Sequence, residues 1–176
     1  MDLSQLDHIF REDYKQGTLS LENVYKNPFE QFKLWFDDIV KLKQKQPNAM
    51  VLSTVSEQGV PESRVVLLKH VSEKGFCFFS NYQSSKGRSI DCNPVVALLF
   101  YNIDLERQIH VHGSIEKLSY EESNSYFQSR PFGSQVSAVA SQQSVEVPSR
   151  SYLENQVKDI LKQNPNGHFK NINSTT

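Results

Sequence analysis

Hydrophobic residues along the chain follow two different spacings, and the change between them falls near residue 49. From Pro28 onward, apolar side chains recur every three or four residues, which is the spacing of an amphipathic helix, and proline suits the first turn of a helix. After residue 49, apolar residues occur in short runs separated by turn-sized polar stretches, as in β-strands. The pattern therefore predicts one helix followed by a group of strands.

Five strand segments are predicted, each bounded by turn residues. Residues 49–56 and 60–71 flank a turn-sized break at Glu57-Gln58-Gly59 and therefore form a hairpin. The remaining strands are residues 76–81, 95–103 and 105–118. Residues 95–103 are apolar enough to be buried on both faces. Short turns between successive strands favour an antiparallel barrel or sandwich over a parallel sheet.

Helical patterns return in the second half of the chain. A short polar helix is predicted over residues 84–93, just before Pro94. Ser119 and Glu122 have capping-box spacing, which starts a helix that Pro131 must end. Residues 133–144 form a further short helical piece. These helices flank the predicted strands.

The two ends of the chain are polar, and the part between them is predicted to be one domain. Ser151 and Glu154 repeat the capping-box spacing and start a last helix that ends near Gln163. A short helix is also expected over residues 6–14. A chain of 176 residues is long enough for one hydrophobic core. We predict a polar N-terminal segment over residues 1–27, a domain over residues 28–163 and a polar tail over residues 164–176.

Composition and charge argue against several classes of protein. The 19 basic and 20 acidic residues leave a net charge of −1, whereas a general nucleic-acid binder carries a basic surplus. The longest clean apolar run, residues 95–101, is too short for a membrane span, and the N-terminus lacks the basic and apolar regions of a signal peptide. Cys77 and Cys92 form no CxxC motif, and we interpret them as reduced thiols in a cytoplasmic protein.

Familiar catalytic and metal-binding motifs are missing from the sequence. It contains no GxSxG, HExxH, P-loop or GxGxxG pattern, so hydrolase, NTPase and Rossmann interpretations lose their usual support. His110 and His112 lie two apart on a predicted strand and so point to the same face. They could ligate a metal, but no third ligand has suitable spacing. We predict no metal site and prefer two imidazoles on a half-exposed strand face.

One group of polar residues could bind a phosphate. Tyr126 and Arg130 stand four apart on the helix after Ser119, and Ser134 follows the break at Pro131. A phenol, a guanidinium and a hydroxyl that converge would suit a phosphate, which takes charge-assisted hydrogen bonds. A solvated helix end, with arginine near its C-terminus, explains the same spacing.

Other basic and polar residues are further candidates. Ser84, Ser85 and Lys86 open the short polar helix, where unpaired amides and a lysine can hold an anion, although an ordinary serine N-cap explains them too. The run RVVLLKH, residues 64–70, carries two cations on an otherwise apolar strand. The candidate polar contacts for a heteroaromatic ring are Gln108, Gln142, Gln143 and Ser144, although glutamine is common on surfaces.

Taken in order, these segments resemble the pyridoxamine 5'-phosphate oxidase family. The resemblance runs with consistent spacing from about Phe29 to Leu161, and its segments are RVVLLKH, FFSNYQSSKGRSI, NPVVALLFYNIDLERQIHVHGSIEKLS and SYFQSRPFGSQVSAVASQQS, followed by SR with LE. It implies a mainly β fold with flanking helices, an antiparallel split β-barrel of the FMN-binding type. It also implies a homodimer with FMN bound between the subunits.

The resemblance implies roles for individual residues. Arg64 would serve the FMN phosphate, Lys69 the substrate, and Gln143 with Ser144 would come from the other subunit. The implied cofactor-binding residues are Arg64, Val65, Val66, Leu67, Leu68, Lys69, Phe79, Ser80, Ser85, Lys86, Gln108, Gln143 and Ser144. The implied substrate-binding residues are Lys69, Tyr126, Arg130 and Ser134.

The function implied by the resemblance is an oxidation in vitamin B6 metabolism. Pyridoxamine or pyridoxine 5'-phosphate would be converted to pyridoxal 5'-phosphate, with dioxygen as the final acceptor. Hydride would pass from the substrate C4' carbon to flavin N5, so the cofactor carries the hard chemistry and no catalytic side chain is assigned. Two alternatives stay open: a protein that binds FMN or pyridoxal phosphate with little turnover, and a flavin oxidoreductase for another substrate.

Two departures from the family pattern affect these expectations. Ser85 stands where the family typically has arginine, so one charge for the FMN phosphate is lost. The family also continues with a tryptophan-containing strand and an Arg-Leu-His segment, whereas the only tryptophan here is Trp35 and the sequence ends at Thr176. Because such residues position the substrate, we expect ligand binding with turnover lowered at least about tenfold, or about 1.4 kcal/mol in the barrier.

Overall fold

The fold contains two antiparallel sheets. The computed structural model describes residues 13–165, 167 and 169, so the short helix predicted over residues 6–14 falls almost entirely outside the described residues. The larger sheet has the strand order β2-β1-β5-β6, and the smaller one pairs β3 with β4. The strands are β1 Ala49–Val55, β2 Pro61–Leu67, β3 His70–Ser72, β4 Gly75–Cys77, β5 Val95–Asn102 and β6 Arg107–Ser114. The predicted antiparallel fold with flanking helices is confirmed.

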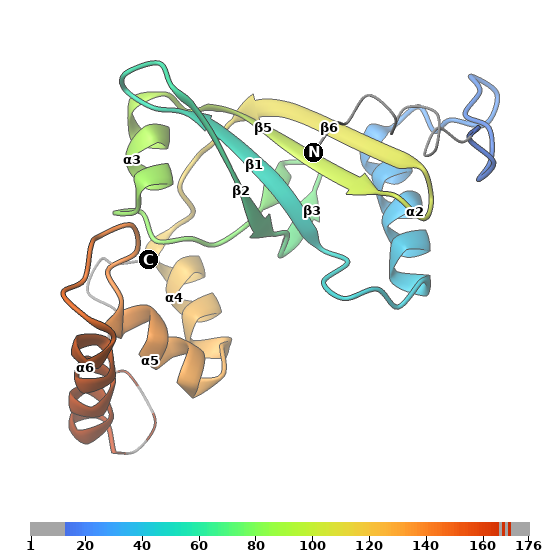
Figure 1. The fold of residues 1–176 in the computed structure, drawn as a ribbon. Helices are drawn as coiled ribbons and strands as arrows, with labels where there is room; N and C mark the ends of the chain where they lie inside the picture. The colour runs from blue at the N-terminus through green and yellow to red at the C-terminus, as the bar shows by residue number, and fades with distance from the viewer. Residues whose placement is uncertain (1–12, 166, 168, 170–176) are drawn as a thin grey trace, which may run out of the picture.

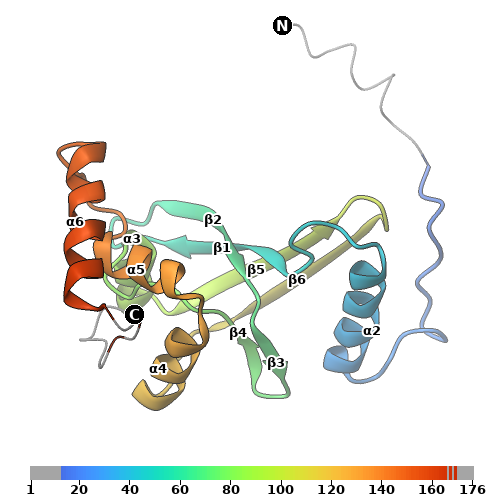
Figure 2. The ribbon, with the colours of Figure 1, turned by 90° about the horizontal axis from the view of Figure 1, so that it is seen from below.

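Helices lie at both ends of the larger sheet. Figure 1 and Figure 2 show α2 at one end, α3 at the other, and α4 to α6 gathered on the side of α3. The helices are α2 Pro28–Lys41, α3 Ser85–Cys92, α4 Tyr120–Ser129, α5 Phe132–Ala140 and α6 Arg150–Gln163. Within the described residues, none of them is both long and apolar enough to cross a membrane.

The first described helix, α2, begins where the sequence predicts. Asn27 is the N-cap, and its side-chain oxygen accepts a hydrogen bond of 2.8 Å from the backbone N–H of Phe29. Phe32 is buried, and its ring packs edge-on against Phe76 and Phe100 at centroid distances of 4.8 and 5.0 Å. These aromatic contacts attach α2 to both sheets.

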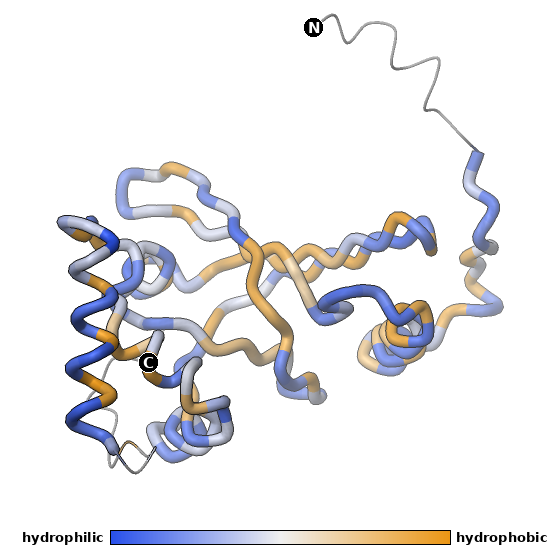
Figure 3. Tube along the Cα trace, turned by 60° about the horizontal axis from the view of Figure 1, so that its bottom comes forward, coloured by the Kyte–Doolittle hydropathy of each residue, from blue (hydrophilic) through white to orange (hydrophobic). Residues whose placement is uncertain are grey.

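The main core lies on one face of the larger sheet. Its buried residues are Phe32, Met50, Leu52, Val66, Leu68, Val96, Leu98 and Phe100. Figure 3 shows the hydrophobic residues gathered along the strands, whereas α6 is mostly hydrophilic. On β5, Val95 and Tyr101 are 59% and 66% exposed. The prediction that this strand is buried on both faces is therefore wrong for the single chain, because only one of its faces meets the core.

The long strand predicted over residues 60–71 is divided between the two sheets. The backbone N–H of Leu68 donates to Asn48 O at 2.8 Å, beside the larger sheet, whereas the N–H of Lys69 donates to Cys77 O at 2.8 Å, in the smaller one. The chain therefore passes from one sheet to the other at this point. The described residues form six strands where five were predicted.

The capping box predicted for α4 is present, but the one predicted for α6 is not. Glu122 accepts a hydrogen bond from the Ser119 N–H at 3.1 Å, and the Glu122 N–H donates to Ser119 Oγ at 3.2 Å. Helix α6 is capped instead by Ser149, whose Oγ accepts from the Tyr152 N–H at 3.1 Å. The helix therefore starts at Arg150, and Ser151 lies inside it.

One residue of the predicted polar tail, Phe169, packs against two aromatic rings. The ring of Phe169 lies 5.9 Å from that of Phe127 on α4 and 5.7 Å from that of Phe132 on α5. Gln128 Nε2 also donates to Phe169 O at 3.0 Å. The division into residues 1–27, 28–163 and 164–176 stays a prediction.

Candidate functional site

A cavity of about 840 Å³ lies beside β2, the start of α3, and the helices α4 and α5. Its lining residues are Val65, Val66, Leu67, Lys69, Phe79, Ser80, Asn81, Tyr82, Lys86, Ser123, Tyr126, Phe127, Ser129, Arg130, Pro131, Ser134, Ser137, Ala138, Ser141 and Gln143. Among the described residues, three cations and no aspartate or glutamate line it. The protein as a whole has a net charge of −1, so the positive charge is a local feature that suits an anionic ligand.

Lys86 is the most buried of these cations, with 8% of its surface exposed. Its Nζ donates to Ser84 Oγ at 2.9 Å and to Gln143 Oε1 at 3.0 Å. Burial lowers the pKa of Lys86 below its ordinary value, and the positive charge of Arg64 lowers it further. Within the described part of the chain, Lys86 forms no salt bridge. A buried ammonium with only neutral partners is poised for an anion.

A second cation of the cavity, Lys69, lies next to a pair of stacked aromatic rings. Phe79 and Tyr126 stack with a centroid distance of 3.7 Å and an interplanar angle of 6°. Lys69 Nζ lies 5.7 Å from the centre of the Tyr126 ring. Cations within about 6 Å of a ring are attracted to its face. Lys69 therefore lies over the tyrosine ring and, among the described residues, has no carboxylate in a salt bridge with it.

Tyr126, Arg130 and Ser134 all line the cavity, but not because they share a helix face. Helix α4 ends at Ser129, and Arg130 is its C-cap, with extended backbone angles of φ −73° and ψ 149°. Ser134 lies in the first turn of α5. The prediction that Tyr126 and Arg130 project from one helix face is therefore wrong, although the reversal between the helices brings the three side chains into one cavity.

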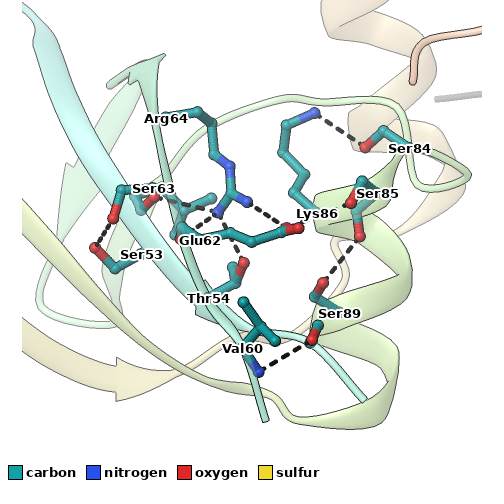
Figure 4. A network of polar contacts seen from close by, with 12 residues as sticks. Ser53, Thr54, Val60, Glu62, Ser63, Arg64, Ser84, Ser85, Lys86 and Ser89 are labelled. Carbon is teal, nitrogen blue, oxygen red and sulfur yellow. Dashed lines mark hydrogen bonds and ion pairs between the residues drawn. The ribbon is translucent and has the colours of Figure 1, made fainter. Parts of the chain in front are cut away.

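Arg64 and Ser85 lie next to the cavity rather than in its lining. Arg64 Nη1 donates to Thr54 Oγ1 at 2.7 Å, and Nη2 forms a salt bridge of 3.0 Å with Glu62. Ser85 Oγ donates to the same Glu62 oxygen at 3.3 Å. Figure 4 shows these side chains between β2 and the start of α3, close to Lys86. The guanidinium predicted to serve a phosphate is thus already paired with a carboxylate.

The other predicted residues divide into those in the cavity and those outside it. Val65, Val66, Leu67, Phe79, Ser80 and Gln143 line the cavity. Leu68 belongs to the core, and Gln108 and Ser144 lie exposed elsewhere. Gln143 Oε1 accepts the hydrogen bond from Lys86 of the same chain, whereas Gln143 was expected at the site of a partner subunit. The contribution of Gln143 and Ser144 to a partner subunit's site stays a prediction.

Two functional candidates escaped the sequence reasoning. Ser123 Oγ is buried and has no hydrogen-bond partner among the described residues, and Ser123 lines the cavity. Its position three residues before Tyr126 on a helix was the available signal. Glu62 lies two residues before Arg64 on a strand, so both side chains point to the same face, which was the signal for their pairing.

The lining of the cavity does not include His110, His112, Cys77 or Cys92. The rings of His110 and His112 meet edge to face at 4.2 Å. Among residues 13–165, 167 and 169, no group of three histidine, cysteine or acidic side chains is placed to hold a metal. Cys77 and Cys92 are free, and burial raises the pKa of the Cys77 thiol. The cytoplasmic location stays a prediction.

Two solved structures have a fold similar to that of this chain. The crystal structure of PhzG from Burkholderia lata 383, in complex with tetrahydrophenazine-1-carboxylic acid, has a TM-score of 0.77 at 23% identity, over 83% of this chain and 73% of that one. A pyridoxamine 5'-phosphate oxidase-related, FMN binding protein from Nostoc punctiforme has a TM-score of 0.58 at 13% identity, over 74% and 73%. Both likenesses extend over most of the fold described above.

Comparison of sequences identifies the family. The chain is 49% identical to a pyridoxine/pyridoxamine 5'-phosphate oxidase of Paraburkholderia phytofirmans over 153 residues, which are 87% of this chain and 72% of the relative. It is equally similar to the enzyme of the same name from Burkholderia mallei, over 85% and 70%. The sequence profile of the family described as pyridoxamine 5'-phosphate oxidase matches residues 37–164. The predicted resemblance is confirmed, and the chain belongs to the pyridoxamine 5'-phosphate oxidase family.

Proposed function

We propose that the protein is an FMN-dependent oxidase that converts pyridoxamine or pyridoxine 5'-phosphate into pyridoxal 5'-phosphate, with dioxygen as the acceptor. The observation that carries this proposal is the cavity of about 840 Å³ lined by three cations and, among the described residues, by no carboxylate. Its volume lies within the range of about 300–1,000 Å³ that small-molecule sites occupy. Relatives at 49% identity carry the name of this activity.

The residues around Lys86 fit the phosphate of FMN. The buried ammonium has only neutral partners, so a phosphate would supply the negative charge that it lacks. Val65 and Leu67 offer an apolar wall along β2, against which a flat ring can lie. When bound, FMN supplies the two-electron redox chemistry of the oxidation. The chain itself holds and orients the cofactor.

The residues around Tyr126 fit the phosphate of the substrate. Lys69, Arg130 and Ser134 can each donate a hydrogen bond to a phosphate oxygen, and two of them add a positive charge. Each phosphorylated ligand then has its own basic contacts. With the two phosphates bound at separate places, the pyridine ring of the substrate would lie between its own phosphate contacts and the flavin. Such positioning lowers the entropic part of the activation barrier for the oxidation.

The proposal is tested with purified protein of this 176-residue sequence. Apoprotein titrated with FMN is expected to shift the visible flavin spectrum, and the loaded protein with pyridoxamine 5'-phosphate and dioxygen is expected to yield pyridoxal 5'-phosphate and peroxide. Binding of both ligands without product would reduce the proposal to a binding protein. Protein that cannot be loaded with FMN would remove it altogether.

We also propose that the protein is a homodimer that packs through the outer face of its larger sheet. Strand register places Tyr101 beside Gln108, and Leu99 beside His110, on that face. Val65 lies on the same face, is 64% exposed, and also lines the cavity. A second copy on this surface would cover apolar residues and close the cavity, while Gln108 would reach the partner's cofactor.

The dimer is tested with Tyr101→Glu. A charge placed in an apolar interface is costly to desolvate, whereas the side chain is exposed in the single chain, so the variant is expected to fold and to sediment as a monomer. Tyr152→Glu on α6, where the tyrosine is 45% exposed, is the matched control and should stay dimeric. A monomeric wild type that still binds FMN tightly would contradict the proposed interface.

A further inference from the structure

Glu62 holds two groups of the proposed cofactor site. Its Oε2 accepts hydrogen bonds from Arg64 Nη2 at 3.0 Å and from Ser85 Oγ at 3.3 Å. Figure 4 shows the carboxylate between β2 and the first turn of α3. It thus takes the contacts that an anion bound there would take.

The pairing keeps the guanidinium of Arg64 turned toward the strands. Arg64 Nη1 donates to Thr54 Oγ1 at 2.7 Å and to the backbone oxygen of Glu62 at 3.1 Å. The three residues after Arg64 line the cavity, but Arg64 does not. Glu62 therefore fixes this cation beside the cavity and offsets its charge.

The charge of Arg64 still reaches the cavity. It contributes, after burial, to lowering the pKa of Lys86, which is itself in the cavity lining. Arg64, Lys86 and Glu62 thus form one electrostatic cluster with a single carboxylate. Any anion that approaches Lys86 is attracted by the two cations and repelled by Glu62.

We propose that Glu62 is a resident anion that competes with the cofactor phosphate for Arg64 and Ser85, and so sets the affinity of the protein for FMN. The proposal rests on the proposed function, because it takes the group next to Lys86 to be the FMN phosphate. The effect is specific for the phosphate: a flavin without one has no charge for Glu62 to repel. The effect of Glu62 on FMN affinity is limited in magnitude. The Glu62 carboxylate is partly exposed, and solvent screens the interactions of exposed charges.

The test compares FMN with riboflavin, which has the same ring system and no phosphate. Dissociation constants of apoprotein are measured from the quenching of flavin fluorescence for wild type, Glu62→Gln and Glu62→Ala. Both variants are expected to bind FMN about three- to tenfold more tightly, with riboflavin affinity changed by less than about twofold. The gain should shrink as salt is added, since ions screen the repulsion.

Glu57→Gln is the matched control. Glu57 lies in the exposed turn of the same hairpin, so the substitution removes the same charge without touching the cluster. It should leave both dissociation constants unchanged, and thermal melts establish that all variants are folded. Unchanged or weaker FMN binding by both Glu62 variants, or an equal gain for riboflavin, would overturn the inference. Wild-type protein that binds neither flavin would instead refute the proposed function on which it rests.

Discussion

Replacing Gly87 with alanine is expected to cause the largest loss of stability of the substitutions considered. A Cβ atom at this position would lie 1.9 Å from the carbonyl oxygen of Tyr82 and 2.5 Å from its carbonyl carbon. Both are backbone atoms, which cannot move aside like the end of a flexible side chain. We expect a loss of about 3 kcal/mol or more, because overpacking that forces backbone shifts typically costs 1–3 kcal/mol and occasionally more.

The same clash should also damage the proposed cofactor site. Gly87 follows Lys86 in the first turn of α3, and Tyr82 lines the cavity. A shift of either segment would displace the ammonium from Ser84 and Gln143. Thermal melts and FMN titrations of Gly87→Ala measure the two effects separately.

Gly133→Ala is the matched control. Gly133 lies in α5, and among the described residues an added Cβ would meet no atom within 4 Å apart from its chain neighbours and the backbone of its own helix. Alanine is favoured over glycine in a helix by about 0.5–1 kcal/mol, so this variant should be slightly more stable than wild type. If Gly87→Ala is as stable as Gly133→Ala, then the close approach of Tyr82 to α3 does not exist in solution.

Lys86→Ala and Arg130→Ala are expected to separate the two proposed phosphate sites. Lys86→Ala should weaken FMN binding, whereas Arg130→Ala should mainly raise the KM for the phosphorylated substrate. Each removes a charge-assisted contact worth about 1.5–3 kcal/mol, or about ten- to a hundredfold in affinity. Flavin titration measures the dissociation constant for FMN, and steady-state kinetics at saturating FMN measure the KM for the substrate.

Stability should change little in Lys86→Ala. The lowered pKa of Lys86 means that burying its charged form opposes folding, and alanine removes that cost. Alanine also loses the hydrogen bonds to Ser84 and Gln143, which acts in the opposite direction. Lys33→Ala, on the exposed side of α2, controls for the loss of a positive charge. Equal loss of flavin by both site variants, with no effect on substrate, would show that the assignment of two separate sites is wrong.

Local patterns in the sequence were enough for most elements. Pro28 predicted the start of α2, and the spacing of Ser119 and Glu122 predicted the capping box of α4. Such features depend on residues three or four apart, whose geometry the helix itself fixes. The antiparallel order of the strands followed from their short connections for a similar reason.

The resemblance of the motifs to the family located most residues of the candidate site. It did not predict which groups pair with the charged side chains of that site. Lys69, Lys86, Tyr126, Arg130 and Ser134 were all named from the sequence, and all line one cavity. Spacing alone left Lys86 open to a simpler explanation, and likewise the group of Tyr126, Arg130 and Ser134. The ordered series of motifs selected among these explanations, because one short pattern carries little information and several in order carry much more.

What the sequence determined by itself was the type and order of the elements and the identity of the basic residues. Only the tertiary structure decided that the strand after Arg64 changes sheets at Lys69, that Ser149 rather than Ser151 caps α6, and that β5 is buried on one face. It alone also brought Ser85 to Glu62 and Lys86 to Gln143. The physical reason is that these outcomes depend on which groups compete for the same hydrogen bond or the same buried surface. Residue spacing does not encode the result of that competition once distant segments are brought together.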